Sequence, residues 1–150
     1  MTNTHRRKGN DWESLLVDLL ESRIKGCKAN RIAGSGAIGT QIGEPLLTGD
    51  IIAMIPGFPK KFRFEAKVGY GGATQHAIKR EWLNKIREEA HNSSSIPIMG
   101  LKFSGARKTD GVQHFVALDF DTFCDIMNYV GMIKRQYDND MENHQKTNSN

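Results

Sequence analysis

Two acidic residues and a lysine in the middle of the chain are spaced so that they can meet at one metal ion. From Phe62 to Val68 apolar and charged residues alternate, so in a strand Glu65 and Lys67 share one face with Arg63. Asp50 precedes a β-branched segment that can pair with this strand. Carboxylates are preferred ligands of Mg²⁺ and Mn²⁺, and such an ion polarises a phosphate and lowers the pKa of water. The pattern therefore indicates phosphodiester hydrolysis, with Lys67 beside the attacking water.

The same charged row has a second interpretation that requires no chemistry. Arg63, Glu65 and Lys67 can be the solvated face of a half-exposed strand, because a carboxylate two residues before a lysine is a common string. The strand pattern by itself leaves both interpretations open.

Glu13 is a third candidate carboxylate, on a helix expected over residues 11–23. On a helical wheel it lies beside Leu16 and Leu20, at the border of the buried stripe, where a metal ligand or a water-positioning group has to lie. Asn10 and Glu13 are also spaced like a capping box at a helix start, which involves no catalysis. Both interpretations stay open.

A glycine-rich stretch from Gly34 to Gly43 contains the letters GxGxxG. A dinucleotide site needs this motif to open a helix, but Glu44 and Pro45 follow shortly and there is no Walker lysine. We therefore expect no nucleotide cofactor. The stretch is either a loop whose backbone approaches phosphate, with Arg31 and Ser35 as contacts, or an ordinary surface loop.

Further basic and polar residues can contact a DNA backbone, although each is equally suited to a plain helix surface or turn. They are Tyr70 and Gln75 just after the charged strand, Lys79 and Arg80 at the next helix, and Arg107 and Lys108 in a late turn. Neither the two cysteines nor the five histidines show the spacing of a zinc site.

The surrounding elements predict an α/β fold. Hydrophobic periodicity indicates helices over residues 11–23, 75–90 and from 121, and strands over 28–33, 50–55, 62–68, 96–103 and 113–118, in the order αβββαββα. The helix 75–90 is expected to bury Ile78 and Ile86 and to leave Lys85 in water. The expected organisation is a flexible basic N-terminus over residues 1–10, one domain over 11–135 and a disordered polar tail over 136–150.

Charge distribution favours a polyanionic partner. The chain carries a net charge of +4, and without the tail it has 20 basic against 14 acidic groups, a net charge of +6. The basic residues near the N-terminus are not followed by an apolar signal region, and no stretch approaches 18 apolar residues. We expect a cytoplasmic protein, nucleoid-associated or in a host cytoplasm if viral, with no membrane partner.

These features together resemble the PD-(D/E)XK nuclease superfamily. The resemblance covers about residues 11–118 and consists of a helix with Glu13, a glycine and serine loop, Gly49-Asp50, and Glu65-Ala66-Lys67 on the third strand. Within the superfamily the chain looks most like the small Holliday junction resolvases of archaea and phages. Gly49 occupies the position at which the motif's name has proline, which leaves the subfamily less defined than the superfamily.

The resemblance implies a restriction-endonuclease-like core with a mixed central sheet flanked by helices. It implies an Mg²⁺ site, open to Mn²⁺, formed by Asp50, Glu65 and the Ala66 carbonyl, with Glu13 as an outer ligand and Lys67 serving the water. It also implies that the loop from Arg31 to Gly36 touches DNA, with Ser35 needed for activity. The implied partners are branched four-way DNA junctions and a second copy of the chain in a two-fold dimer.

Two other functions fit the same residues. One keeps the chemistry but makes the chain a restriction-like or nicking endonuclease on duplex DNA. The other is a DNA-binding module without catalysis, in which the carboxylates only stabilise strand ends. Cleavage in Mg²⁺ separates the second from the rest, and comparison of junction with linear duplex separates the first.

Overall fold

The computed structural model describes residues 2–32, 50–69 and 74–147, and the chain divides into two compact units. Unit 1 comprises residues 1–118 and unit 2 residues 119–150. This differs from the single domain expected over residues 11–135, because the boundary falls between the last strand and the last helix.

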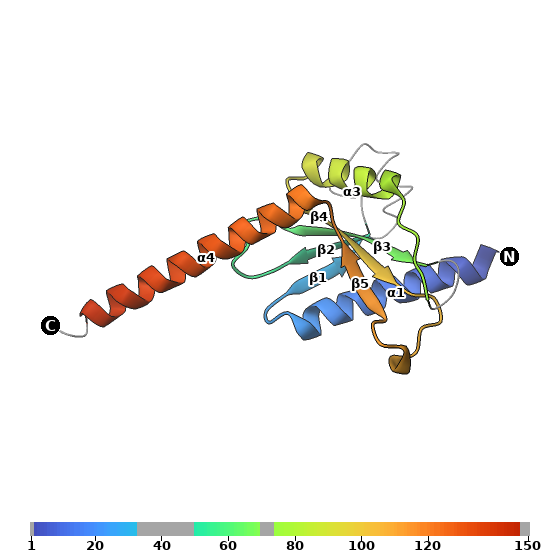
Figure 1. Cartoon of the computed structure of the whole chain (residues 1–150), viewed down its shortest axis with the longest axis horizontal. Coiled ribbons are helices and arrows are strands. Elements are labelled where there is room, and N and C mark those ends of the chain that lie inside the picture. Colours follow the sequence, from blue (N-terminus) through green and yellow to red (C-terminus); the bar gives the residue numbers. More distant parts are fainter. Residues whose placement is uncertain (1, 33–49, 70–73, 148–150) are drawn as a thin grey trace. The chain divides into compact units, whose positions relative to one another are not determined.

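The described residues of unit 1 form a mixed five-stranded sheet in the order β1-β2-β3-β4-β5 (Figure 1). Strands β3 and β4 pair in parallel and the other neighbours are antiparallel. The strands are β1 (Lys28–Arg31), β2 (Ile51–Met54), β3 (Phe62–Val68), β4 (Ile96–Lys102) and β5 (His114–Ala117). The predicted α/β class, the mixed central sheet and the hairpin of β2 with β3 are confirmed.

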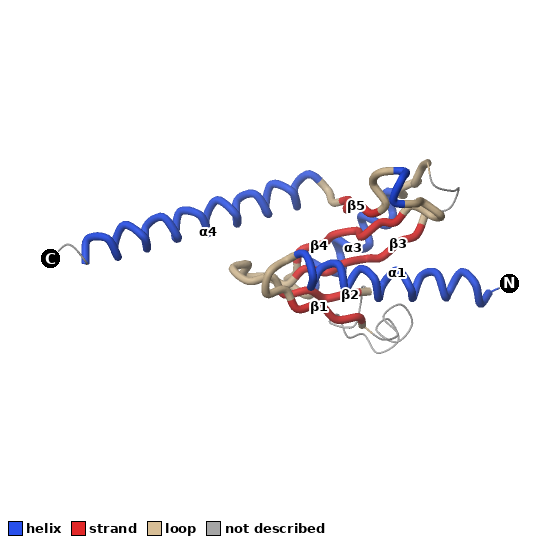
Figure 2. Tube along the Cα trace, turned by 90° about the horizontal axis from the view of Figure 1, so that it is seen from below, coloured by secondary structure: helices blue, strands red, loops and turns tan. Residues whose placement is uncertain are grey.

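Helices α1 (Thr2–Arg23) and α3 (Arg80–Asn92) cover opposite faces of this sheet (Figures 1 and 2). Side chains alternate along β4, so Gly100 faces α1 while Met99 and Leu101 face the other way, where they pack with Ile86 of α3. On the α1 side, Trp12 donates a hydrogen bond from Nε1 to the Gly100 carbonyl, at 3.1 Å. The sheet is therefore the middle layer of three, and β3 and β4 lie between the two helices.

Strand β3 has the two faces that its sequence predicts, but its charged face is covered. Phe62 and Phe64 are buried, and on the charged face Arg63 is 1% exposed and Glu65 5% exposed. Arg63 donates from Nε to the hydroxyls of Ser93 and Ser95 at the end of α3. The interpretation of this row as a solvated strand face is therefore wrong. A buried charged row at the contact with a helix requires partners for each charge.

Helix α1 begins at Thr2, far before the expected start near residue 11. Asn10 consequently lies inside the helix, and the capping-box interpretation of Asn10 and Glu13 is wrong. The residues expected to form a flexible N-terminus, 1–10, lie in this helix from Thr2 onward.

Helix α3 begins at Arg80, five residues later than expected, and Gln75 and Ile78 lie exposed before it. His76 explains the delay. Its ring packs edge-on against Phe103 and Phe115, and so holds the chain across the ends of β4 and β5 before the helix can start.

Unit 2 consists mainly of α4 (Phe120–Thr147), so residues 136–147 are helical where a disordered tail was expected. Asp119 caps the helix start by accepting from the Thr122 backbone N–H and hydroxyl. An i,i+4 ion pair of Lys134 with Asp138, at 2.9 Å, supports the polar part of the helix. Among the described helices, none is long and apolar enough to cross a membrane.

Candidate active site

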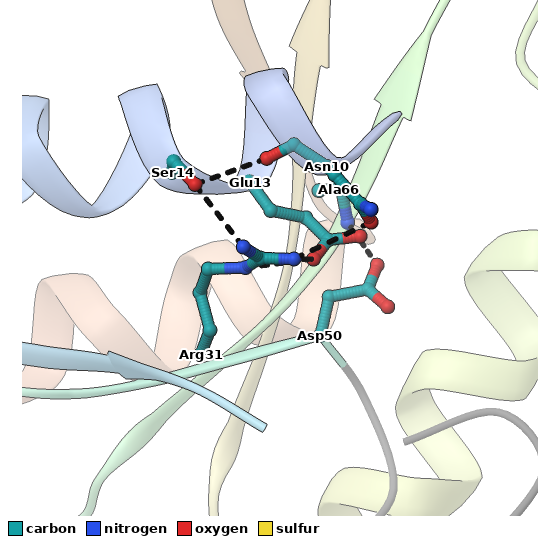
Figure 3. A network of polar contacts seen from close by, with 6 residues as sticks. All are labelled: Asn10, Glu13, Ser14, Arg31, Asp50 and Ala66. Atoms are coloured by element: carbon teal, nitrogen blue, oxygen red, sulfur yellow. Dashed lines mark hydrogen bonds and ion pairs between the residues drawn. The ribbon is translucent and has the colours of Figure 1, made fainter. Parts of the chain in front are cut away.

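The candidate site lies where β2 and β3 separate. Their ladder extends from Ala53 paired with Phe62 to Ile51 paired with Phe64, and Asp50 is the next residue outward. Asp50 donates its backbone N–H to the Phe64 carbonyl at 3.0 Å, and its Oδ2 accepts from the Ala66 backbone N–H at 2.7 Å (Figure 3). The carboxylate thus replaces the missing strand partner and is fixed beside the end of β3.

Asp50 lies in the electrostatic field of the residues that the sequence singled out. Its pKa is raised to about 6, first by burial and then by the charge of Glu65, with a smaller contribution from Glu13. The hydrogen bond from Ala66 and the charge of Lys67 act in the opposite direction. Glu65, Glu13 and Lys67 are therefore near enough to Asp50 for their charges to act on its pKa.

Glu65 is the most buried carboxylate of the group and has two cations beside one of its oxygens. Lys67 Nζ lies 2.6 Å from Glu65 Oε1, and Lys85 Nζ lies 3.7 Å from the same atom. Lys67 also lies over the ring of Trp82, at 5.7 Å from its centroid, so helix α3 supplies a surface on which this ammonium rests. Two positive charges offset the cost of burying Glu65.

Lys85 is the site residue that the sequence analysis missed, because it was assigned to the solvated face of α3. It pairs with Glu89 at 3.5 Å as well as with Glu65. Burial lowers the pKa of Lys85, but the charges of Glu65, Glu89 and Asp50 outweigh it and the net shift is upward. The available signal was its place in the sequence, between Trp82 and Ile86, which puts it at the border of the buried stripe.

Glu13 is held by Arg31 at the other side of the site (Figure 3). Arg31 donates to Glu13 Oε2 from Nε at 3.0 Å and from Nη2 at 2.6 Å. The same guanidinium donates to Ser14 Oγ at 3.1 Å and to Asn10 Oδ1 at 3.4 Å. Arg31 therefore ties the end of β1 to three polar side chains on one face of α1, and the network fixes one carboxylate oxygen of Glu13.

The structure describes only some of the residues that were predicted to contact DNA. Ser35, Gly36 and Tyr70 lie outside the described residues, and Arg31 lies in the Glu13 network. Lys79 and Arg80 are exposed at the start of α3, where Lys79 also lies 5.7 Å from the Trp82 centroid. Arg107 and Lys108 are exposed at η2 (Lys108–Asp110), which Figure 1 places on the far side of the sheet from α3. These two basic pairs therefore do not form one surface.

The chemistry of the site fits a divalent metal ion. The described residues include no group of three or more His, Cys, Asp or Glu side chains arranged to hold a metal. The candidate ligands among them are the neighbouring carboxylates Asp50 and Glu65. Mg²⁺ usually keeps several waters and is held by one or two carboxylates together with substrate phosphate. Asp50, whose pKa is raised by burial and by the neighbouring charge of Glu65, gains most from a cation placed between the two carboxylates.

A mixed sheet between two helices, with an aspartate at the start of one strand and Glu65-Ala66-Lys67 on its neighbour, defines a PD-(D/E)XK nuclease core. The family model described as "Phage putative PDDEXK endonuclease" matches residues 4–149, nearly the whole chain, and the chain belongs to this family. A comparison with curated proteins finds no match.

Proposed function

We propose that this endonuclease is an Mg²⁺-dependent, structure-selective enzyme that nicks four-way DNA junctions symmetrically, as a Holliday junction resolvase. The observation that carries the catalytic part is the convergence of Asp50, Glu65 and Lys67 at the diverging ends of β2 and β3. The finer substrate assignment is supported by the resemblance over residues 11–118, which are nearly all of unit 1.

Asp50 and Glu65 are the proposed metal ligands, with the Ala66 carbonyl beside them and Glu13 as an outer ligand. When bound, the ion supplies positive charge at the scissile phosphate and lowers the pKa of water, and Mn²⁺ is expected to substitute for Mg²⁺. Lys67 is the proposed group that orients the attacking water and stabilises the developing negative charge. Its ammonium is already held within 2.6 Å of Glu65 and over Trp82, so it needs little rearrangement to act.

The DNA contacts are proposed to come from two regions of the chain. Lys79 and Arg80, exposed at the start of α3, are suited to backbone phosphates. Gln75 and Tyr70, which follow the charged strand in the sequence, are proposed as further contacts, together with the loop over residues 31–36 that the resemblance indicates. Arg107 and Lys108 are proposed to reach a second arm of the junction, because the short helix η2 that they begin lies on the other side of the sheet from α3.

Recognition of DNA structure, and not of base sequence, is the part of this proposal that comes from the resemblance to Holliday junction resolvases. Beyond unit 1 the described residues form α4, so they include no separate domain for reading bases. Two strands of a four-way junction must be cut at related positions, which a two-fold dimer achieves with one active site on each strand. We therefore propose a homodimer as the active form.

The test is cleavage of a four-way junction, a flap and a linear duplex of matched sequence, each with Mg²⁺, with Mn²⁺ and with EDTA. The proposal expects paired nicks at symmetric positions in the junction, with either metal, and little cutting of the duplex. Equal cutting of linear duplex would support a restriction-like enzyme instead and would remove the resolvase assignment. Junction binding without cleavage in either metal would support a non-catalytic DNA-binding module.

The matched control for catalysis is Glu65→Gln, which keeps the size of the side chain and removes one metal ligand. It is expected to bind junction as the wild type does in EDTA and to cut none of the three substrates. Wild-type cleavage by this variant would contradict the metal site, whatever the substrate preference.

A further inference from the structure

Lys85 on α3 and Lys67 on β3 both lie within ion-pair distance of the same oxygen of Glu65, Oε1. They differ in whether a second carboxylate lies beside them. Lys85 has a second carboxylate within reach, Glu89 at 3.5 Å, one helical turn further along α3. Among the described residues, Glu65 is the one acidic side chain within ion-pair distance of Lys67. If another cation binds Glu65, Lys85 therefore still has a carboxylate to pair with, whereas Lys67 has none among the described residues.

Glu89 is well placed to receive Lys85. Its side chain is 16% exposed, and its Oε2 atom is buried without a hydrogen-bond partner. A buried carboxylate oxygen without a partner is unfavourable, so a stronger contact with Lys85 stabilises Glu89. The Lys85 side chain is 54% exposed, which leaves it free to change rotamer.

We propose that Lys85 is a positioning residue of the metal site, which holds the Glu65 carboxylate in the metal-free protein and moves to Glu89 when a divalent cation binds Glu65. The role rests on the proposed function, because it requires Asp50 and Glu65 to be the metal ligands. Lys85 competes with the metal for Glu65, and Glu89 lowers the cost of that exchange. Lys67, for which the described residues offer no second carboxylate within ion-pair distance, is left over the Trp82 ring and free to face the substrate.

The experiment measures Mn²⁺ affinity of the full chain without DNA, by calorimetry and by the electron paramagnetic resonance of free Mn²⁺. Lys85→Met removes the competitor and is expected to tighten Mn²⁺ binding about fivefold, the scale of one partly exposed ion pair. Glu89→Gln removes the second partner, so Lys85 stays on Glu65, and Mn²⁺ binding is expected to weaken about threefold. Circular dichroism checks that each variant keeps its helices, and Lys85→Gln replaces the methionine variant if it does not fold.

Long-range electrostatics also changes metal affinity in these directions, so two further arms isolate the contact. Arg87→Met and Glu88→Gln remove the same charges from exposed positions of α3 and are expected to leave the affinity within twofold of the wild type. In the double variant Lys85→Met with Glu89→Gln, the weakening caused by Glu89→Gln is expected to disappear, because Glu89 acts through Lys85.

Each outcome decides the proposal. An unchanged affinity in Lys85→Met, or a Glu89→Gln effect that persists in full without Lys85, overturns the role of Lys85 and leaves the metal site intact. Absence of saturable Mn²⁺ binding in the wild type overturns both the metal site and this role. Opposite shifts in the two single variants, with loss of the Glu89 effect in the double variant, support it.

Discussion

The Asp50 carboxylate accepts the backbone N–H of Ala66 at the point where β2 no longer pairs with β3. This contact places an acidic group beside Glu65, although the two carboxylates repel each other and Glu65 is buried and Asp50 half-buried. Lys67 and Lys85 offset the charge of Glu65, but the raised pKa of Asp50 shows that its charged form is still unfavourable, a loss of stability that is common at functional sites.

Asp50→Asn is therefore expected to abolish cleavage and to stabilise the metal-free protein. Because the folded-state pKa of Asp50 is raised from 3.8 to about 6, its contribution to stability is fully present below pH 4 and is lost as the pH rises through 6. Asparagine keeps an acceptor for Ala66 but carries no charge, so the gain at pH 8 is on the order of 1–3 kcal/mol. Urea unfolding in EDTA at pH 5 and pH 8 measures it. If the stability gained by Asp50→Asn does not increase between pH 5 and pH 8, the charge of Asp50 is not its cause.

Lys67→Met is expected to lower the cleavage rate by about 10²–10⁴-fold, the range of a group that assists proton transfer or charge development in the transition state. Junction affinity in EDTA is expected to stay near the wild-type value, because Lys67 is paired with Glu65 before substrate arrives. Single-turnover cleavage and gel-shift titration measure the two effects. Lys60→Met, an exposed lysine in the turn before β3, is the control and should cut at the wild-type rate.

The order of the elements and the charged row of Arg63, Glu65 and Lys67 could be predicted from the sequence because both depend on local periodicity. Alternation along residues 62–68 fixed which side chains share a face, and the structure keeps Glu65 and Lys67 together. Local periodicity does not predict which element packs against that face of the strand. The packing of α3 on it, which buries Arg63 and brings in Lys85, is a tertiary contact between segments about twenty residues apart.

The predicted starts of helices α1 and α3 differ from the observed ones for a related reason. Asn10 has the side chain of a helix cap, but helix α1 continues through it to Thr2, and its amide meets Arg31 from a distant strand. The late start of α3 depends on His76 packing against two aromatic rings from β5 and the end of β4. In each case a long-range partner decided the conformation of a locally ambiguous residue.

Gly100→Ala is expected to destabilise unit 1 by about 1–3 kcal/mol, the usual range for overpacking a core. A Cβ at this position would lie 2.4 Å from Cδ2 of Leu16, which is buried between α1 and the sheet. Thermal or urea unfolding measures the loss. Leu16→Ala removes the clash, so it should destabilise the Gly100→Ala protein less than it destabilises the wild type. Equal losses in the two backgrounds would show that the contact is not the cause.

His114 is expected to make stability depend on pH in weakly acidic solution. Its ring stacks on Trp12 at 5.1 Å between centroids, and its pKa is lowered by burial and by the charge of Lys102. The folded state therefore favours the neutral ring, and stability falls as the pH decreases through 6.5 toward the lowered value. His114→Phe keeps a ring without a proton to bind. The difference in melting temperature between wild type and variant should change between pH 7.5 and pH 5.5, with the wild type losing more.

The pair of Arg31 and Glu13 gives a prediction that separates a structural from a catalytic role. Arg31 makes four hydrogen bonds to α1, two of them to one oxygen of Glu13, so a double-mutant cycle of Arg31→Ala and Glu13→Ala should give a coupling energy of about 1 kcal/mol. Glu13→Gln keeps an acceptor for Arg31 and removes the charge near Asp50, so it should fold as the wild type does but bind Mn²⁺ more weakly. Urea unfolding and Mn²⁺ titration of these variants measure the two effects. If Glu13→Gln loses stability but keeps the wild-type Mn²⁺ affinity, then Glu13 serves only to hold β1 against α1.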